Sequence, residues 1–390
     1  MGWSPFRPTG LTHHQPGISF KGYTLFSPIG GDSAYLLNMD GEIVHRWRVP
    51  GFRIFCPKLL PNGKLMALCQ DAAMAIPRRP EPGAQPPPGP DVFRLIGGAN
   101  TDLLELDWDG NITWRYTNLA IHHDFALLPN GNVVIPEFLE IPPELAKRVR
   151  GGVRRPGEKL PPLISDDFIE VNREGKVVKR TSLWKLLDPA KDPIGPLERR
   201  WEWTHTNSVD VTAEGHLLFS CRTNSRVGIL DRDAERITWK YGDPNTFYQH
   251  HASSLPNGNV LIFDNGMNRL HDLSYSRIVE VNPRNSTVTW QYEANPRQQF
   301  FSGHISGAHR LPNGNTLICE GTSGRLFEVT ASGEIAWEFI NPMHHALGPM
   351  RQSWVFRAYR YGPDYGGLAD RSLDPAAHAD LNRLHGLESR

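Results

Sequence analysis

One short phrase occurs five times along this chain of 390 residues, and it limits what the chain can fold into. Each copy has a Pro-Asn-Gly or Ala-Glu-Gly turn followed by aliphatic and β-branched residues. The copies are LLPNGKLMAL from Leu59, LLPNGNVVIP from Leu127, VTAEGHLLFS from Val211, SLPNGNVLIF from Ser254 and RLPNGNTLIC from Arg310. Asn-Gly supplies the positive φ angles of a tight turn, and the residues after it favour strands. Each copy therefore predicts a β-hairpin.

A second phrase follows the hairpins and occurs six times. Most copies have a polar turn and then a strand with an aromatic residue near its end. They are YLLNMDGEIVHRW from Tyr35, LLELDWDGNITWRY from Leu103, FIEVNREGKVVKRT from Phe168, VGILDRDAERITWKY from Val227, RIVEVNPRNSTVTWQY from Arg277 and RLFEVTASGEIAWEF from Arg325. Repeated units of four short antiparallel strands are typical of a β-propeller. We therefore predict an all-β, six-bladed β-propeller.

Six second phrases and five hairpins leave one blade without its innermost strand. The two ends of the chain can supply it, because VFRAYRY from Val355 can pair with GYTLFS from Gly22. Such pairing leaves no open sheet edge. We expect one propeller domain over residues 18–362, closed between N- and C-terminal strands, with terminal extensions at 1–17 and 363–390.

Composition excludes several classes of partner. The formal net charge is zero, so there is no electrostatic argument for nucleic acid or an anionic membrane as partner. No apolar run reaches the roughly 18 residues of a membrane-spanning helix. The N-terminus carries Pro, Gly and His where a signal peptide needs an apolar core, so we expect a cytoplasmic protein. Its oligomeric state is open.

The remaining local features are cysteines and insertions. Four scattered cysteines form no C-x-x-C pair, and Cys69, Cys221 and Cys319 follow hairpins, where buried free thiols are expected. Three insertions interrupt the blades, and each is either a lid over the channel mouth or a solvated decoration. They are a proline-rich segment from Pro77, a segment from Glu144 that begins as a short helix, and a segment from Ser182 with one or two helical turns.

Histidines gather just before four of the hairpins. Seven of the sixteen histidines lie there: His122, His123, His205, His250, His251, His304 and His309. The segment that leads into a blade's first strand lies near the propeller axis, so these side chains are expected to converge. Each imidazole has a ring nitrogen that needs a partner, and several together favour a ligand, a metal or water. One member of each adjacent pair must point away from the axis.

The second half of the chain resembles a known family. The runs WEWTHTNSVDV, FYQHHASSLPNGNVLIFDNGMNR and GAHRLPNGNTLICEG, between Trp201 and Phe339, are similar to the arylsulfate sulfotransferases, which are six-bladed propellers. The resemblance implies transfer of a sulfuryl group from an aryl sulfate to a phenol through a sulfated histidine, with a small aromatic substrate and no cofactor.

The resemblance also implies roles for individual residues. By motif position, His205, His250 and Arg269 hold the sulfate oxygens and stabilise the leaving phenolate. The nucleophile lies in SGHISGAHRLPNG, where His304 and His309 compete. We favour His304, because it stands at the same distance from its turn as His205 does.

Further substrate-binding candidates surround these catalytic ones. Asn207 follows His205 in H-x-N-S, and Arg222 lies in the matching run; each has a structural interpretation that is equally acceptable. His123, His251 and the less favoured His309 complete the substrate-binding set.

Two other functions remain open. A metalloenzyme could bind iron, copper or zinc through His123, His205, His250 and His304, with Asp124 and Asp210 orienting the rings. A cation such as Arg269 near the histidines favours sulfate over a divalent metal. A propeller that binds a protein or peptide without catalysis is the third possibility, although that role does not require inner histidines.

Overall fold

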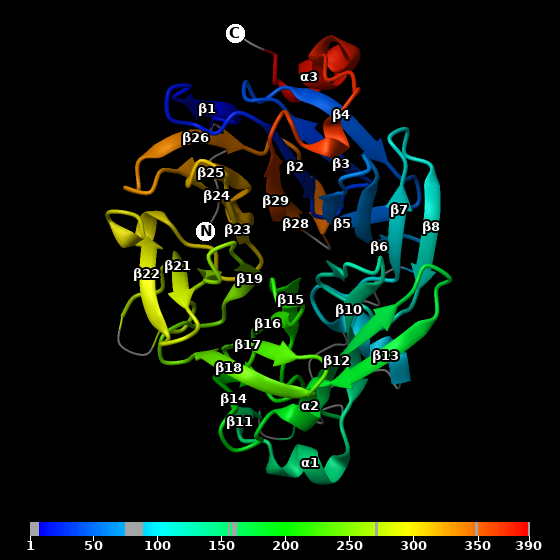
Figure 1. Cartoon of the computed structure of the whole chain (residues 1–390), viewed down its shortest axis with the longest axis vertical. Helices are drawn as coiled ribbons and strands as arrows, with labels where there is room; N and C mark the ends of the chain where they lie inside the picture. The colour runs from blue at the N-terminus through cyan, green and yellow to red at the C-terminus, as the bar shows by residue number, and fades with distance from the viewer. Residues whose placement is uncertain are drawn as a thin grey trace. The chain divides into compact units, whose positions relative to one another are not determined.

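The structure is a computed structural model that describes residues 8–74, 89–154, 157, 162–269, 272–347 and 350–388. Within these ranges the chain forms six antiparallel sheets of four or five strands, the blades of a six-bladed β-propeller (Figure 1). The predicted fold class is confirmed. The strand content follows from the repeated phrases, and the glycines of all five predicted hairpins have φ between 80° and 87°.

The three sheets from the N-terminal part of the chain and the termini have the following order. The first is β29 (Val355–Tyr361), β2 (Tyr23–Pro28), β3 (Ser33–Leu37) and β4 (Ile43–Arg48). The second is β5 (Phe52–Leu59), β6 (Leu65–Asp71), β7 (Asp102–Leu106) and β8 (Ile112–Thr117). The third is β9 (Ala126–Leu127), β10 (Val133–Glu140), β12 (Ile164–Val171) and β13 (Val177–Ser182).

The remaining sheets repeat the same order of strands. The fourth is β15 (Thr206–Val211), β16 (Leu217–Cys221), β17 (Arg226–Asp231) and β18 (Arg236–Gly242). The fifth is β19 (His250–Ser254), β20 (Val260–Asp264), β21 (Arg277–Asn282) and β22 (Thr287–Tyr292). The sixth is β23 (Gly307–Arg310), β24 (Thr316–Glu320), β25 (Arg325–Val329), β26 (Ile335–Ile340) and β1 (Gly10–His14).

Smaller elements connect the blades. Two short two-stranded sheets pair β11 (Gly151–Val153) with β14 (Ile194–Arg199) and β27 (His345–Leu347) with β28 (Met350–Gln352). The α-helices are α1 (Pro143–Arg148), α2 (Leu183–Leu186) and α3 (Ala379–His385). The 3-10 helices are η1 (Gly89–Leu95), η2 (Arg297–Gln299), η3 (Gly321–Ser323), η4 (Gly366–Leu368) and η5 (Pro375–His378).

Packing divides the chain into two compact units. Unit one comprises Met1–Cys69, Leu103–Trp114 and Ile305–Arg390, and unit two comprises Gln70–Asp102 and Arg115–His304. Unit one holds the first and sixth sheets and most of the second. Unit two holds the third, fourth and fifth sheets, which carry most of the predicted site residues.

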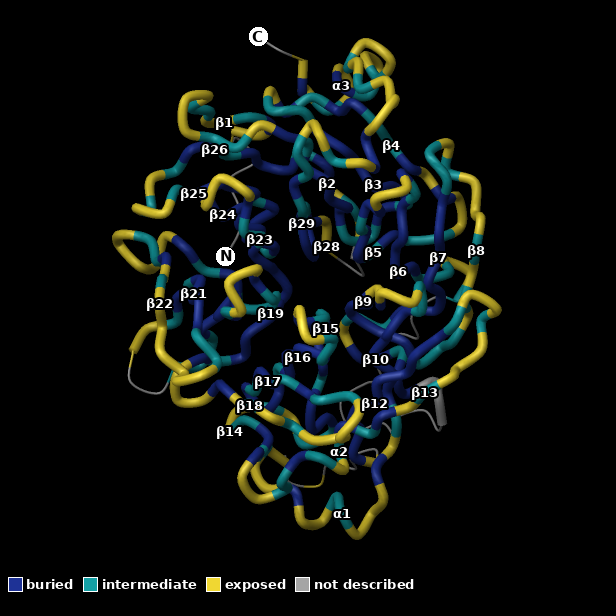
Figure 2. Tube along the Cα trace, viewed as in Figure 1, coloured by how far each residue is buried: buried dark blue, intermediate teal, exposed yellow. Residues whose placement is uncertain are grey.

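Burial falls from the middle strands of a sheet to its outer strand. All residues of β3, β12 and β20 are buried, whereas the outer strands β8 and β22 are largely exposed (Figure 2). In unit two, the rings of Phe168 and Phe219 meet in the core between the third and fourth sheets, with centroids 5.9 Å apart. Each middle strand is therefore covered on both faces, as neighbouring blades require.

The predicted closure within unit one is confirmed. Strand β29 pairs with β2 in antiparallel register, with Tyr361 opposite Tyr23 and Ala358 opposite Phe26. The Arg360 guanidinium of β29 forms a fully buried ion pair with Glu328 of β25. The C-terminal strand is thus held by both backbone pairing and charge.

Segments outside residues 18–362 also have defined contacts in unit one. Strand β1 pairs with β26 as a fifth strand of the sixth sheet. Asn382 of α3 accepts from the Ile43 amide at 2.8 Å and donates to the Ile43 carbonyl at 3.1 Å. Both terminal segments therefore extend the packing of unit one.

The structure describes two of the three predicted insertions, and all four cysteines. The insertion after Glu144 begins as helix α1, and the one after Ser182 contains the single turn α2. The proline-rich insertion from Pro77 lies mostly outside the described residues. All four cysteines, Cys56 included, are buried and outside disulfides, as expected for three of them. Among the described residues, no helix has the length and apolar character needed to cross a membrane.

Candidate functional site

Six of the seven predicted histidines belong to unit two. His309 belongs to unit one, on strand β23, where its Nδ1 accepts a 3.2 Å hydrogen bond from the Arg360 amide. Burial and the Arg360 charge lower the pKa of His309 to about 4. His309 is thus bonded to the backbone of the closing strand, whereas His304 is grouped with the other histidines of unit two.

His122 and His123 are adjacent, buried and in contact with each other. The Nδ1 atoms of the two rings lie 2.8 Å apart, at hydrogen-bonding distance. The Nε2 atom of His122 lies 3.1 Å from Oδ1 of Asp166, and both of these side chains are fully buried. The ring of His122 also stacks on Phe138, with centroids 3.6 Å apart. Burial lowers the pKa of His122, and the contact with Asp166 opposes that shift only in part.

His205 is oriented by a carboxylate three residues earlier in the chain. Its Nδ1 is hydrogen-bonded to Oε2 of Glu202, and both side chains are at most 10% exposed. His205 has φ of 51°, and the register between β15 and β16 shifts just after it. Because Glu202 occupies Nδ1, the ring nitrogen that remains for chemistry is Nε2.

His123 brings the pair of histidines against His205. The two ring centroids lie 4.5 Å apart with the planes at 69°. Gly98 makes room for this arrangement, because a Cβ at that position would lie 2.2 Å from Nε2 of His123. The amide of His123 donates to the Gly98 carbonyl at 2.9 Å. Gly98, which precedes β7, therefore packs against His123.

His250 has a fixed neutral form. The amide of Asn265 donates through Nδ2 to the Ser302 carbonyl at 2.7 Å, so its oxygen faces Nδ1 of His250 at 2.8 Å. The oxygen can only accept, so His250 carries its proton on Nδ1 and a lone pair on Nε2. Burial, followed by the Arg222 charge, holds the pKa of His250 well below its usual range, and His205 and His304 lower it further.

His304 completes the group. Burial first and the Arg222 charge second lower the pKa of this histidine to about 4, so the ring is neutral at neutral pH. Its backbone carbonyl accepts a 3.0 Å hydrogen bond from Ser302. Ser302 also accepts through its carbonyl from Asn265, so the same residue supports His250 and His304.

Arg222 is the cation that acts on both His250 and His304. Its amide donates to the His205 carbonyl at 3.1 Å, its guanidinium lies 5.3 Å from the ring of Tyr248, and Nη2 lies 2.9 Å from Glu198. The side chain is 16% exposed and Glu198 is 18% exposed. The sequence left the role of Arg222 open; in the structure its amide bonds the His205 carbonyl, and its charge lowers the pKa of His250 and His304.

Arg269 has other surroundings. It donates to Oδ2 of Asp264 at 2.7 Å and lies over the rings of Tyr275 and Phe247, at 4.4 Å and 5.5 Å from their centroids. Asp264 is fully buried and also binds Arg277 at 2.9 Å. The Asp264 carboxylate therefore balances the charge of both arginines.

Two other predicted substrate-binding residues lie in the same unit. Asn207 is fully buried and donates to the Gln249 carbonyl at 2.8 Å, so it braces the residue before His250. His251 has φ of 45° at the irregular step between β19 and β20 and is buried.

The metalloenzyme hypothesis named Asp124 and Asp210 as the carboxylates that orient the rings. Asp124 and Asp210 accept hydrogen bonds from the backbone amides of Val209 and Ser254. Asp166 and Glu202 instead contact His122 and His205. Within the part of the chain that is described, no group of three or more His, Cys, Asp or Glu side chains is arranged to hold a metal ion.

The sequence patterns missed Asp166, Glu202 and Gly98, and they did not foresee the contact of Asn265 with His250. Glu202 stands in the same motif as His205, and a carboxylate three residues from a candidate histidine was a usable signal. Asp166 had no such signal, since it lies on β12 and meets β15 through the Thr206 amide, which donates to Oδ2 at 2.7 Å. Contacts between neighbouring sheets do not follow from sequence spacing.

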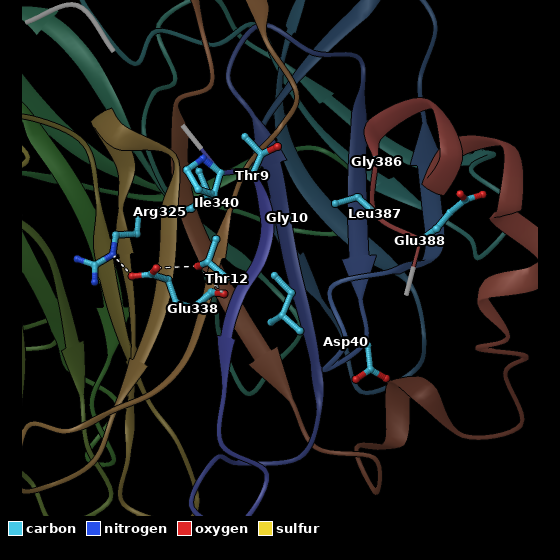
Figure 3. A pocket seen from close by; sticks show the side chains of 12 residues that line it. Thr9, Gly10, Thr12, Asp40, Arg325, Glu338, Ile340, Gly386, Leu387 and Glu388 are labelled. Atoms are coloured by element: carbon cyan, nitrogen blue, oxygen red, sulfur yellow. Dashed lines mark hydrogen bonds and ion pairs between the residues drawn. The ribbon is translucent and has the colours of Figure 1, made fainter. Parts of the chain in front are cut away.

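A separate pocket of about 1120 Å³ lies in unit one (Figure 3). Its walls include Thr12 of β1, Arg325 of β25 and Glu338 of β26, and Arg325 and Thr12 both bond Glu338. None of the predicted site residues lines this pocket.

Comparison with known proteins adds the family. The sequence model described as arylsulfotransferase (ASST) matches residues 100–342, more than half of the chain and further toward the N-terminus than the motifs that suggested it. No match was found among curated proteins.

Among similar solved structures, one with a TM-score above 0.5 supports the fold alone. A protein of unknown function from Bacteroides caccae is 13% identical, with a TM-score of 0.53 over 87% of this chain and 98% of that one. A streptogramin B lyase has 11% identity and a TM-score of 0.47, covering 91% and 93% of the two chains. The WD40 β-propeller domain of Doa1 has 10% identity and a TM-score of 0.46, covering 91% and 97%. On the strength of the sequence match and the six blades, the chain belongs to the arylsulfotransferase family.

Proposed function

We propose that the chain transfers a sulfuryl group from an aryl sulfate to a phenol, with His304 as the nucleophile. The observation that carries this proposal is that His250 and His304 are buried and held neutral, that the charge of Arg222 lowers the pKa of each ring after burial, and that the Arg222 amide donates to the His205 carbonyl at 3.1 Å. A neutral imidazole has the lone pair that attack on sulfur requires, and a cation beside it stabilises the sulfate oxygens.

The proposed reaction has two half-reactions. In the first, a ring nitrogen of His304 attacks sulfur, the bond from sulfur to the phenolic oxygen breaks, and the phenolate leaves. In the second, the oxygen of the acceptor phenol attacks the sulfated His304, the nitrogen–sulfur bond breaks, and the phenolic proton passes to a base. Nε2 of His205 is the proposed proton carrier, since Glu202 occupies its Nδ1 and stabilises the charged ring.

Arg222 and His250 are the proposed holders of the sulfuryl oxygens. Arg222 presents several N–H donors, only some of which are engaged by Glu198. Arg269 is proposed to support the site indirectly, because Asp264 already neutralises its charge. Asn207 would position His250 through the Gln249 backbone.

The experiment is a transfer assay with purified protein, 4-nitrophenyl sulfate as donor and phenol as acceptor. Without acceptor, about one equivalent of nitrophenolate should appear in a burst; with phenol, release should continue and phenyl sulfate should accumulate. His304→Ala should lower the rate by about 10³-fold or more, and His309→Ala should lower it much less. Wild-type protein that transfers nothing would refute the function, and a loss confined to His309→Ala would move the nucleophile there.

Elemental analysis of the same preparation tests the metalloenzyme hypothesis. Transfer that continues in the presence of a chelator, in protein without bound iron, copper or zinc, agrees with the proposed function. One equivalent of any of these metals together with no sulfuryl transfer would instead favour a metal-dependent reaction at the histidines.

A further inference from the structure

Five titratable side chains of unit two form one continuous line. Asp166 contacts Nε2 of His122 at 3.1 Å, and Nδ1 of His122 meets Nδ1 of His123 at 2.8 Å. The ring of His123 lies against that of His205, which is bonded to Glu202. The line therefore has a carboxylate at each end and reaches the proposed site through His205.

The partners assign the proton positions along this line. Nε2 of His122 lies 3.1 Å from a carboxylate oxygen, and a lone pair there would repel that oxygen, so the neutral ring is more stable with its proton on Nε2 and with Nδ1 as an acceptor. His123 must then donate through its own Nδ1, which leaves the lone pair of His123 on Nε2. The Thr206 amide, 2.7 Å from the second oxygen of Asp166, keeps the carboxylate in place.

We propose that Asp166, His122 and His123 are positioning residues that hold His205 in its working orientation. This proposal rests on the proposed function. One carboxylate, acting through two rings, selects a single tautomer for His123 and so gives its ring dipole one direction beside His205. Glu202 orients the His205 ring from Nδ1, and His123 supports it at a second contact. Around metal ligands, partners one step removed from the reacting groups typically contribute 10- to 100-fold to activity, and we expect an effect of about that size here.

Asp166→Asn is the sharpest test, because it changes one atom and little volume. The amide oxygen must face the Thr206 amide, so the NH₂ group faces Nε2 of His122. Nε2 then becomes an acceptor, the His122 proton moves to Nδ1, and His123 is forced into its opposite tautomer. We expect kcat for transfer from 4-nitrophenyl sulfate to phenol to fall by about 10- to 100-fold, with KM changed by less than about threefold.

Two variants of His122 separate a hydrogen-bonding role from general packing. His122→Phe keeps the stack on Phe138 but removes both polar contacts, so it should lose as much kcat as Asp166→Asn. His122→Gln offers an amide N–H to Asp166 and a carbonyl oxygen to His123, so it should recover most of the lost activity. Equal losses in Gln and Phe variants would overturn the positioning proposal, since a proton-transferring imidazole would then be required.

The matched control is Asp102→Asn. Asp102 is a fully buried carboxylate of the same unit, but Arg115 and Thr117 are its partners instead of a histidine. It should leave kcat within about threefold of wild type, and melting temperatures of all variants report any general destabilisation. Active wild-type protein with an equally active Asp166→Asn variant would refute the positioning role alone, whereas inactive wild-type protein would refute the function itself.

Discussion

Replacing Arg222 with Gln tests the electrostatics on which the proposed nucleophile depends. Protonated His304 has no lone pair, so the first half-reaction should stop as the pH falls through the pKa of this residue. In the folded protein that pKa is about 4, below the ordinary 6.5, so the ring stays neutral and reactive from pH 8 to about pH 5. Removal of the neighbouring positive charge should raise the pKa of His304. The acid limb of the pH–rate profile, where the rate falls, should then move to higher pH.

The magnitude of the shift can be bounded from its causes. The difference between 6.5 and about 4 corresponds to roughly 3 kcal/mol against the charged ring. Burial is the larger cause and the Arg222 charge is the second, so Arg222→Gln should raise the pKa of His304 by at most about one unit. The pKa of the variant should therefore still lie well below 6.5. Loss of the arginine also leaves Glu198 without its partner, so Arg222→Gln with Glu198→Gln isolates the effect of the cation.

The assay is the rate of the nitrophenolate burst between about pH 3.5 and pH 8, measured by stopped flow. Arg232→Gln is the matched control, because Arg232 pairs with Glu170 on another part of unit two and should leave the acid limb in place. A wild-type limb near 6.5 would contradict a buried neutral nucleophile. An unchanged limb in both Arg222 variants would show that this guanidinium does not act on His304.

Two further predictions concern the packing that supports the site and the fold. Gly98→Ala places a Cβ 2.2 Å from the His123 ring at a residue with φ of 80°. The free energy of unfolding should therefore fall by about 1–2 kcal/mol or more, and kcat should fall with it. Urea unfolding and parallel transfer assays measure the two effects. Glu328→Gln leaves Arg360 buried without its carboxylate and should lower the free energy of unfolding by about 3–5 kcal/mol. Glu338→Gln, in a partly exposed pair with Arg325, should lower it by under about 1 kcal/mol. Similar midpoints of guanidinium unfolding for the two variants would contradict the importance of the buried pair.

Much of the fold could be predicted because its signals are local. The Asn-Gly and Glu-Gly turns demand positive φ, which glycine accepts without strain, and the residues after them have β-branched or aliphatic side chains suited to buried strands. The six second phrases and five hairpins also showed that one blade lacked its innermost strand. The pairing of β29 with β2 confirms that the two ends of the chain supply it. The pairing of β1 with β26 could not be foreseen, because Gly10–His14 carries neither phrase.

The candidate site could also be predicted only in part. The windows before the hairpins identified the histidines, and the equal offsets of His205 and His304 from their turns favoured His304, which shares unit two with His205. The resemblance assigned Arg269 to the sulfate oxygens together with His205 and His250. In the structure Asp264, five residues earlier, binds Arg269, and the charge of Arg222 lowers the pKa of His250 and His304.

The amino-acid sequence by itself determined the turns, the strands, the number of blades and the positions of the histidines along the chain, because steric preferences of φ and side-chain packing on a strand act between near neighbours. Only the tertiary structure decided that Asp166 meets His122, that Asn265 sets the tautomer of His250, and that Arg222 lowers the pKa of His304. These effects depend on distances of a few ångströms between residues far apart in sequence and on the loss of water around them, and neither exists before the strands of different blades have packed together.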